Sequence, residues 1–259
     1  MPINSQFGQP RAQTFDRDRP NPATPSADMA GLFPQGVAAA ELRIPGDAAL
    51  LHPEEAASIA RAVPKRVQEF AAGRLCARRA LADLGITDFP LRPGPDRAPR
   101  WPESTVGSIT HTAGFCAAVV AERRRFAALG LDTEVVGDLQ RKLWPRIAVA
   151  AELAWLERLP ASVQPAAAAL IFSAKEAFYK CQFPVTQERL NFSDLTVRAV
   201  EPGEIGRSGQ EGALVVTPTR VLSIARAPCA PILGRYRFHG PYISVGMYLA
   251  ASASLIDPR

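Results

Sequence analysis

Two carboxylates stand one residue apart in the segment GLDTE (130–134), inside a run whose residues predict a strand. Side chains two residues apart in a strand point to the same face, so we expect Asp132 and Glu134 to lie together. Adjacent carboxylates repel unless a cation lies between them, and hard divalent ions such as Mg²⁺ take oxygen ligands of this kind. The pattern describes equally well two solvated acids on an exposed strand.

A second candidate is the segment FSAKEAFYK (172–180). On a helix Glu176 and Lys180 are one turn apart and share a stripe, a spacing that usually gives a surface ion pair worth ~0.3–0.5 kcal/mol. Lys175 and Lys180, however, are two of only four lysines in a chain with 30 basic residues. A chain that otherwise uses arginine has kept lysine twice in one place, which favours a function.

Two further patterns contain cations. Arg66, Arg74 and Arg78 follow a slanted stripe along a predicted helix, where they could bind several phosphate oxygens or form a solvated arginine face. In either case we expect the stripe to face solvent. His111 ends the short strand GSITHT (107–112) and is one of three histidines, so it is either a structural or a functional residue.

Composition and charge limit the class of protein. The chain has 259 residues, a length for one large domain or two small ones, and a net charge of +5. Residues 61–100 carry nine basic and four acidic side chains, a concentration that attracts phosphate, nucleic acid or an acidic partner. The four cysteines are widely spaced, which excludes a disulfide scaffold and a zinc cluster. The longest apolar stretch, 113–121, is too short for a membrane span, and no signal peptide is visible, so we expect a cytoplasmic protein.

The elements that position these residues are predicted as follows. Residues 1–30 are rich in proline and polar residues and predict a disordered tail. Two halves follow, 31–138 and 139–259, each with helices and antiparallel strands, which indicates the α+β class. Helices are expected at 53–62, 64–85, 144–159 and 163–181; strands at 106–110, 115–121, 127–136, 193–200, 213–217, 232–238 and 242–250; and loops at 90–102 and 201–211.

In this order, the motifs resemble one family. They are Arg66 with GRLCARRAL (73–81), RAPRWP (97–102), GSITHT, GLDTE and FSAKEAFYK. Together they are similar to the Sfp-type 4′-phosphopantetheinyl transferases, in the branch that serves siderophore and polyketide synthases and includes the enterobactin synthetase component D type. The resemblance covers about residues 33–250. It implies two similar α+β halves, each a small antiparallel sheet packed with helices, with the active site between them.

The resemblance also implies a reaction: an Mg²⁺-dependent transfer of 4′-phosphopantetheine from coenzyme A to a serine of an apo acyl or peptidyl carrier protein, releasing 3′,5′-ADP. Mn²⁺ is an alternative metal. The implied metal ligands are Asp132, Glu134 and Glu176, and the implied catalytic residues are Glu176 as base, Lys180 and Asp132. The implied coenzyme-binding residues are Arg66, Arg74, Arg97, His111, Lys175 and Lys180. Thr133 stands where the family has a small apolar residue, and the loop at 94–100 varies in this branch.

Two other hypotheses remain open at this point. A metal-dependent nuclease with an acid-x-Lys core is disfavoured because Val136, not a lysine, stands two residues after Glu134. A non-catalytic module that binds coenzyme A or a nucleotide would be expected to lack one of the three acids. We expect carrier proteins as partners, which are typically acidic, and no nucleic acid or membrane. One chain contains both halves, so we expect a monomer.

Overall fold

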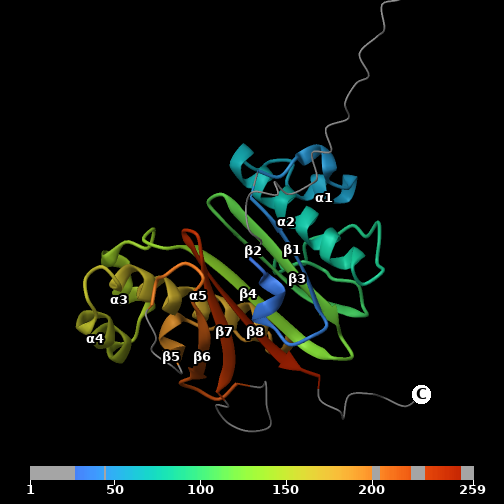
Figure 1. The fold of residues 1–259 in the computed structure, drawn as a ribbon. Helices are drawn as coiled ribbons and strands as arrows, with labels where there is room; N and C mark the ends of the chain where they lie inside the picture. The colour runs from blue at the N-terminus through green and yellow to red at the C-terminus, as the bar shows by residue number, and fades with distance from the viewer. Residues whose placement is uncertain (1–26, 44, 200–204, 223–230, 252–259) are drawn as a thin grey trace, which may run out of the picture.

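The structure is a computed structural model that describes residues 27–43, 45–199, 205–222 and 231–251. Two antiparallel sheets, each packed with helices, confirm the predicted α+β class (Figure 1). The helices are α1 (Pro53–Ser58), α2 (Pro64–Ala82), α3 (Trp144–Ile147), α4 (Ala150–Arg158) and α5 (Gln164–Thr186). The strands are β1 (Val37–Leu42), β2 (Thr105–Thr112), β3 (Phe115–Glu122), β4 (Phe126–Val135), β5 (Leu195–Ala199), β6 (Glu211–Pro218), β7 (Ile232–His239) and β8 (Tyr242–Ala250).

The first sheet has the order β1-β3-β2 and is covered by α2. Pro64 occupies the first turn of α2, where its missing N–H is not needed, and Gly85 follows the helix with a φ of +77° that suits glycine. The helix buries its alanine-rich face, including Ala77 and Ala80, against β3, whose side chains are almost all buried. The sheet therefore holds the arginine-bearing helix firmly in place.

The second sheet has the order β4-β8-β7-β6-β5, and α5 packs across β4 and β8. In Figure 1, α5 lies behind this sheet, and α3 and α4 lie beside it on the left. The packing is close at Gly130, where an added Cβ would meet the backbone oxygen of Ala177 at 2.0 Å. Glycine at this position lets the backbone of α5 approach β4.

The two sheets meet where β2 lies against β4. A shared core of apolar side chains fills the space between them and includes Phe115 and Val119 of β3 and Leu129 and Leu131 of β4. Leu129 and Leu131 face this core, whereas Gly130 and Asp132 face α5.

Several predicted boundaries require correction. The predicted helix 144–159 is two helices, because Ala148 and Val149 are extended and Glu152 caps the second helix by accepting from Val149 N at 2.8 Å. β1 was not predicted, since its sequence VAAAEL lacks a clear alternation and has Val37 as its single β-branched residue.

The structure also differs from the predicted extent of the tail and from the predicted boundary between the two halves. Residues 1–26 lie outside the described residues, but Ala27 and Met29, placed in the tail by the sequence, are buried at 2% exposure each. The boundary at 138/139 would leave β4 with the first half. In the structure β4 pairs with β8, so the sheets divide between Glu122 and Phe126.

Candidate active site

The predicted acids converge on the α5 side of β4. Asp132 is buried and Glu134 half-buried on the strand, while half-buried Glu176 and Lys180 come from the facing side of α5. We call Asp132, Glu134 and Glu176 the acid cluster. Lys180 Nζ donates to Asp132 Oδ1 at 2.6 Å and to the backbone oxygen of Leu131 at 3.2 Å, which joins the helix to the strand.

The carboxylates of the acid cluster shift one another's pKa values. Burial, followed by the charge of Asp132, raises the pKa of Glu134 to about 8, with a smaller contribution from Glu176. Burial and the charge of Asp132 also raise the pKa of Glu176, while Lys180 acts in the opposite direction. Because burial and mutual repulsion disfavour the ionised carboxylates, a bound cation would stabilise their ionised form.

One carboxylate oxygen of the acid cluster is suited to bind a metal ion. Asp132 Oδ2 is buried and has no hydrogen-bond partner among the described residues, although buried carboxylate oxygens are normally satisfied. Three carboxylates form an oxygen donor set suited to Mg²⁺ or Mn²⁺. Within the described ranges, no three acidic, histidine or cysteine side chains already surround a common metal position, and Lys180 holds the place beside Asp132.

Cations from the first half complete this region. Arg66 Nη1 donates to His111 Nε2 at 3.0 Å, and Arg66 also lies 3.5 Å from Glu69 Oε2. Burial lowers the pKa of His111, and Arg66 and Lys180 lower it further, whereas Glu69 and, to a smaller extent, Asp132 raise it. His111 is thus close enough to the acid cluster to feel its charge, and the structure brings Arg66, His111, Lys180 and the acid cluster together.

Lys175 does not belong to this group. Its side chain is wholly buried, and Nζ donates to Glu152 Oε2 at 2.7 Å and to the backbone oxygens of Ile147 and Phe192 at 2.8 and 3.0 Å. An ammonium has three N–H donors, and all three are used. The expected role in neutralising phosphate therefore finds no support, and Lys175 instead ties α5 to the end of α3, the start of α4 and the turn that precedes β5. Nothing in the local sequence pointed to its partner Glu152.

The arginine stripe is only partly exposed, contrary to the expectation that it faces solvent. Arg74 is 5% exposed, Nε donates to the backbone oxygen of Leu91 at 2.7 Å, and the guanidinium lies 4.0 Å from the ring centroid of Phe70. Burial lowers its pKa to about 10. Arg78 forms a 2.7 Å ion pair with Glu55, which is fully buried. Of the three arginines only Arg66 presents an exposed guanidinium.

Arg97 lies apart from these residues in sequence and in environment. It is exposed at the tip of a tight loop, with a φ of +68°, and its backbone N–H donates to the oxygen of Gly94 at 3.0 Å. The predicted loop at 90–102 is confirmed, with a bridge between Pro93 and Pro99 that closes it. No described contact joins the Arg97 side chain to His111 or to the acid cluster.

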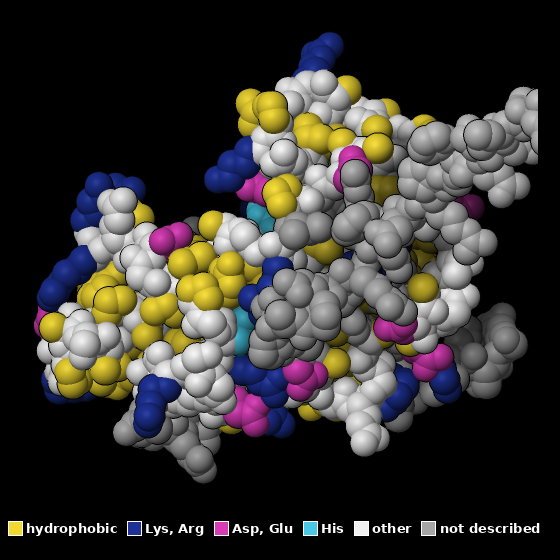
Figure 2. All heavy atoms as spheres, turned by 45° about the horizontal axis from the view of Figure 1, so that its top comes forward, with side chains coloured by type: hydrophobic (Ala, Val, Ile, Leu, Met, Phe, Trp, Pro, Cys, Tyr) yellow, Lys and Arg dark blue, Asp and Glu magenta, His cyan; other side chains and the backbone are white. Residues whose placement is uncertain are grey.

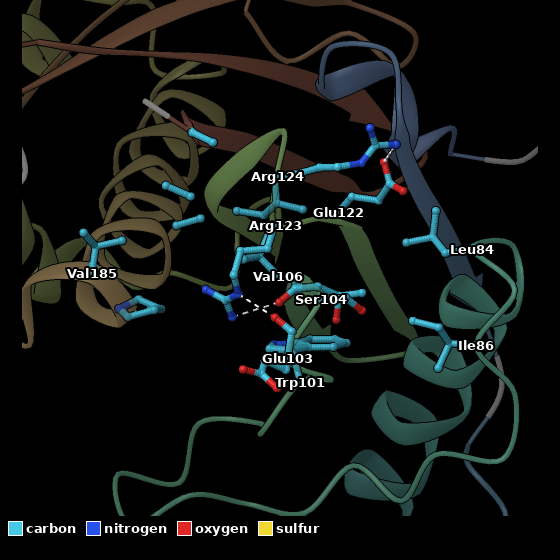
Figure 3. Close-up of a pocket in the computed structure, with 17 residues that line it drawn as sticks. Leu84, Ile86, Trp101, Glu103, Ser104, Val106, Glu122, Arg123, Arg124 and Val185 are labelled. Atoms are coloured by element: carbon cyan, nitrogen blue, oxygen red, sulfur yellow. Dashed lines mark hydrogen bonds and ion pairs between the residues drawn. The ribbon is translucent and has the colours of Figure 1, made fainter. Parts of the chain in front are cut away.

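A cavity of about 900 Å³ lies at the opposite ends of β2 and β4 from His111 and Asp132. Figure 3 shows Trp101 on its floor, Leu84 and Ile86 on one side and Val185 of α5 on the other. The two arginines on its rim already have partners within the protein. Arg123 donates to the backbone oxygens of residues 103 and 105, and Arg124 forms an ion pair with Glu122. None of the predicted site residues lines this cavity.

No helix in the described part of the chain is long and apolar enough to cross a membrane. In Figure 2, lysine and arginine side chains are scattered over the face shown, with acidic side chains between them. Apolar side chains gather on the same face over α3 and α4.

Two family models match this chain in succession. The one described as the 4'-phosphopantetheinyl transferase N-terminal domain matches residues 54–121, and the one described as the 4'-phosphopantetheinyl transferase superfamily matches residues 128–215. The change from one to the other falls at the turn between β3 and β4, where the first sheet gives way to the second.

Individual relatives agree. The chain is 45% identical over 155 residues to 4'-phosphopantetheinyl transferase Svp of Streptomyces mobaraensis, covering 59% of this chain and 62% of that protein. It is 40% identical over 158 residues to 4'-phosphopantetheinyl transferase PptT of Mycobacterium tuberculosis (60% and 69%), and 37% identical over 120 residues to enterobactin synthase component D of Salmonella typhimurium (45% and 48%). The chain thus spans less than two thirds of the first relative and about half of the last. Because it covers more than two thirds of PptT at this identity, and because both family models match it, the chain belongs to the 4'-phosphopantetheinyl transferase family of enzymes.

Proposed function

We propose that this protein transfers 4′-phosphopantetheine from coenzyme A to a serine of an apo acyl or peptidyl carrier protein. The observation that carries the proposal is the convergence of the acid cluster with Lys180, Arg66 and His111 where β2 meets β4. Phosphoryl transfer consists largely of positioning and charge neutralisation, and this group provides a metal ligand set, cations and a base.

The acid cluster would hold Mg²⁺, or Mn²⁺ in its place, with the unpartnered Asp132 Oδ2 as a ready ligand. A bound divalent ion would neutralise charge on the diphosphate of coenzyme A. Arg66 and His111 from the first half and Lys180 from the second would contact the phosphates. Because the structure buries Lys175 and Arg74, we assign both a structural role in holding these elements together.

Glu176 would accept the proton of the carrier serine hydroxyl, directly or through water, because its carboxylate lies in the cluster and its raised pKa makes it a better base. The serine oxygen would then form a bond to the phosphorus that carries phosphopantetheine. The bond from that phosphorus to the bridging oxygen would break, and 3′,5′-ADP would leave with the electron pair. Lys180 is placed to balance the charge that develops on the leaving group.

Intact-mass measurements test this proposal. A panel of apo acyl and peptidyl carriers is incubated with the protein, coenzyme A and Mg²⁺, and the mass of each carrier is then measured. The expected result is a gain of one phosphopantetheine group, absent when the carrier serine is replaced by alanine. Glu176→Gln keeps the shape and should lower single-turnover transfer by roughly 10²-fold or more, while coenzyme A binding changes little. Carriers of unchanged mass throughout the panel would contradict the proposal and would favour a coenzyme-binding module. Near-normal turnover of Glu176→Gln would move the base to Glu134 or to water.

A further inference from the structure

Within the described residues, no ladder of backbone hydrogen bonds joins the two sheets where their edges meet. The strand orders leave β2 at one edge of the first sheet and β4 at one edge of the second, and the two strands lie against each other. The backbone of β4 pairs with β8 on one side. Its N–H groups on the other side point toward β2, and buried N–H groups need partners.

Hydroxyl groups on β2 supply these partners. The backbone N–H of Leu131 donates to Ser108 Oγ at 3.0 Å, and the N–H of Thr133 donates to Thr110 Oγ1 at 2.9 Å. Leu131 and Thr133 are wholly buried, and Thr110 and Ser108 are 1% and 6% exposed. We call Ser108 and Thr110 the hydroxyl ladder.

The hydroxyl ladder fixes the register between the halves. Both of its bonds join residues 23 positions apart in the sequence. An advance of two residues along β2 therefore corresponds to an advance of two residues along β4, so the two strands run parallel. This register sets His111 level with Glu134, and the N–H bonded by Thr110 belongs to the residue between the two acids of β4. A slip of one residue would turn the wrong side chains toward the site.

We propose that Ser108 and Thr110 are positioning residues: by bonding the free edge of β4, they hold Asp132 and Glu134 in register with the phosphate-binding residues of the first half. The catalytic consequence rests on the proposed function, but the ladder itself does not. Without its hydroxyl acceptor, each N–H would be left buried and unpaired, and the edge of β4 would open more often.

Amide hydrogen exchange tests the ladder one bond at a time. Thr110→Val preserves shape but removes the acceptor, so exchange at the Thr133 amide should rise about tenfold or more. Ser108→Ala should do the same at Leu131. The matched control is Thr105→Val on the same strand, equally buried, whose hydroxyl donates to Pro102 O at 3.0 Å within its own half. It should leave both amides unchanged.

Kinetics then test positioning. Thr110→Val should lower kcat for carrier modification about tenfold, with a smaller change in KM for coenzyme A. The kcat values of Thr110→Ser, which keeps the hydroxyl, and of Thr105→Val should stay within about twofold of the natural protein.

Exchange at the Thr133 amide that is as slow in Thr110→Val as in the natural protein would overturn the ladder. Faster exchange with unaltered kcat would overturn the positioning role. If Thr110→Val does not fold, Ser108→Ala decides both questions. A natural protein that modifies no carrier would refute the proposed function, and the exchange measurement would still decide the ladder.

Discussion

At the scale of single residues, two arginines on one helix have different surroundings. Arg66 is exposed and bonds His111, whereas Arg74 is buried against Phe70 and bonds the oxygen of Leu91. Arg74→Ala should therefore lower the free energy of unfolding by about 2–3 kcal/mol, because it leaves a buried oxygen unpaired and removes packing. Arg66→Ala should change stability little and weaken coenzyme A binding. Denaturant unfolding and calorimetric titration of both variants check this; equal stability losses would contradict it.

The raised pKa of Glu134, about 8 against an ordinary 4.5, makes the stability of the metal-free protein depend on pH. Between these values the folded state binds more protons than the unfolded state, so stability should fall as pH rises from about 5 to 8. Melting temperatures measured with a chelator across this range should fall. Glu134→Gln should flatten the trend, and Mg²⁺ should restore stability most at the upper end, where the carboxylate is ionised. A melting temperature that rises with pH in both proteins would refute this assignment.

At the scale of elements, Gly130 sets how closely α5 approaches β4, and with it the distance between Lys180 and Asp132. Gly130→Ala places a Cβ 2.0 Å from the Ala177 oxygen, a backbone atom that moves only with the whole helix. The variant should lose about 1–3 kcal/mol of stability and most of its transfer activity. Gly73→Ala on α2 is the control, since its Cβ meets only the side chain of Ile109 at 3.1 Å and alanine favours a helix. Thermal unfolding and carrier modification of both variants test the difference.

At the scale of the whole molecule, the segment from Ala27 to Leu32 joins the N-terminal region to the second sheet. Arg237 of β7 forms a 2.9 Å ion pair with Asp28 and also donates to the oxygen of Ala27 at 3.1 Å, while Met29 is buried in the core between the sheets. Deleting residues 1–26 should leave the melting temperature nearly unchanged. Deleting residues 1–30 should lower it by several degrees, since core burial and an ion pair are lost. Equal melting temperatures would mean that this segment adds nothing to stability.

The sequence by itself determined the class of fold and the local alignment of the acidic side chains. The alternation along β4 was enough to place Asp132 and Glu134 on one face, and helical spacing was enough to align Glu176 with Lys180. These are local rules of backbone geometry, so they hold before any tertiary contact forms. The joint order of the motifs indicated the family, which the comparisons confirm.

Only the tertiary structure decided which charged side chains are free to act. Lys175 and Lys180 look alike in the sequence, but the helix turns the first into the core toward Glu152 and the second toward Asp132. Arg74 lies on a buried turn of α2, where it bonds the oxygen of Leu91, whereas Arg66 lies on an exposed turn and bonds His111. Burial and partner choice depend on residues far away in the chain, such as Glu152 for Lys175 and Ser108 for Leu131. The tertiary fold brings these pairs together, and no local spacing encodes them.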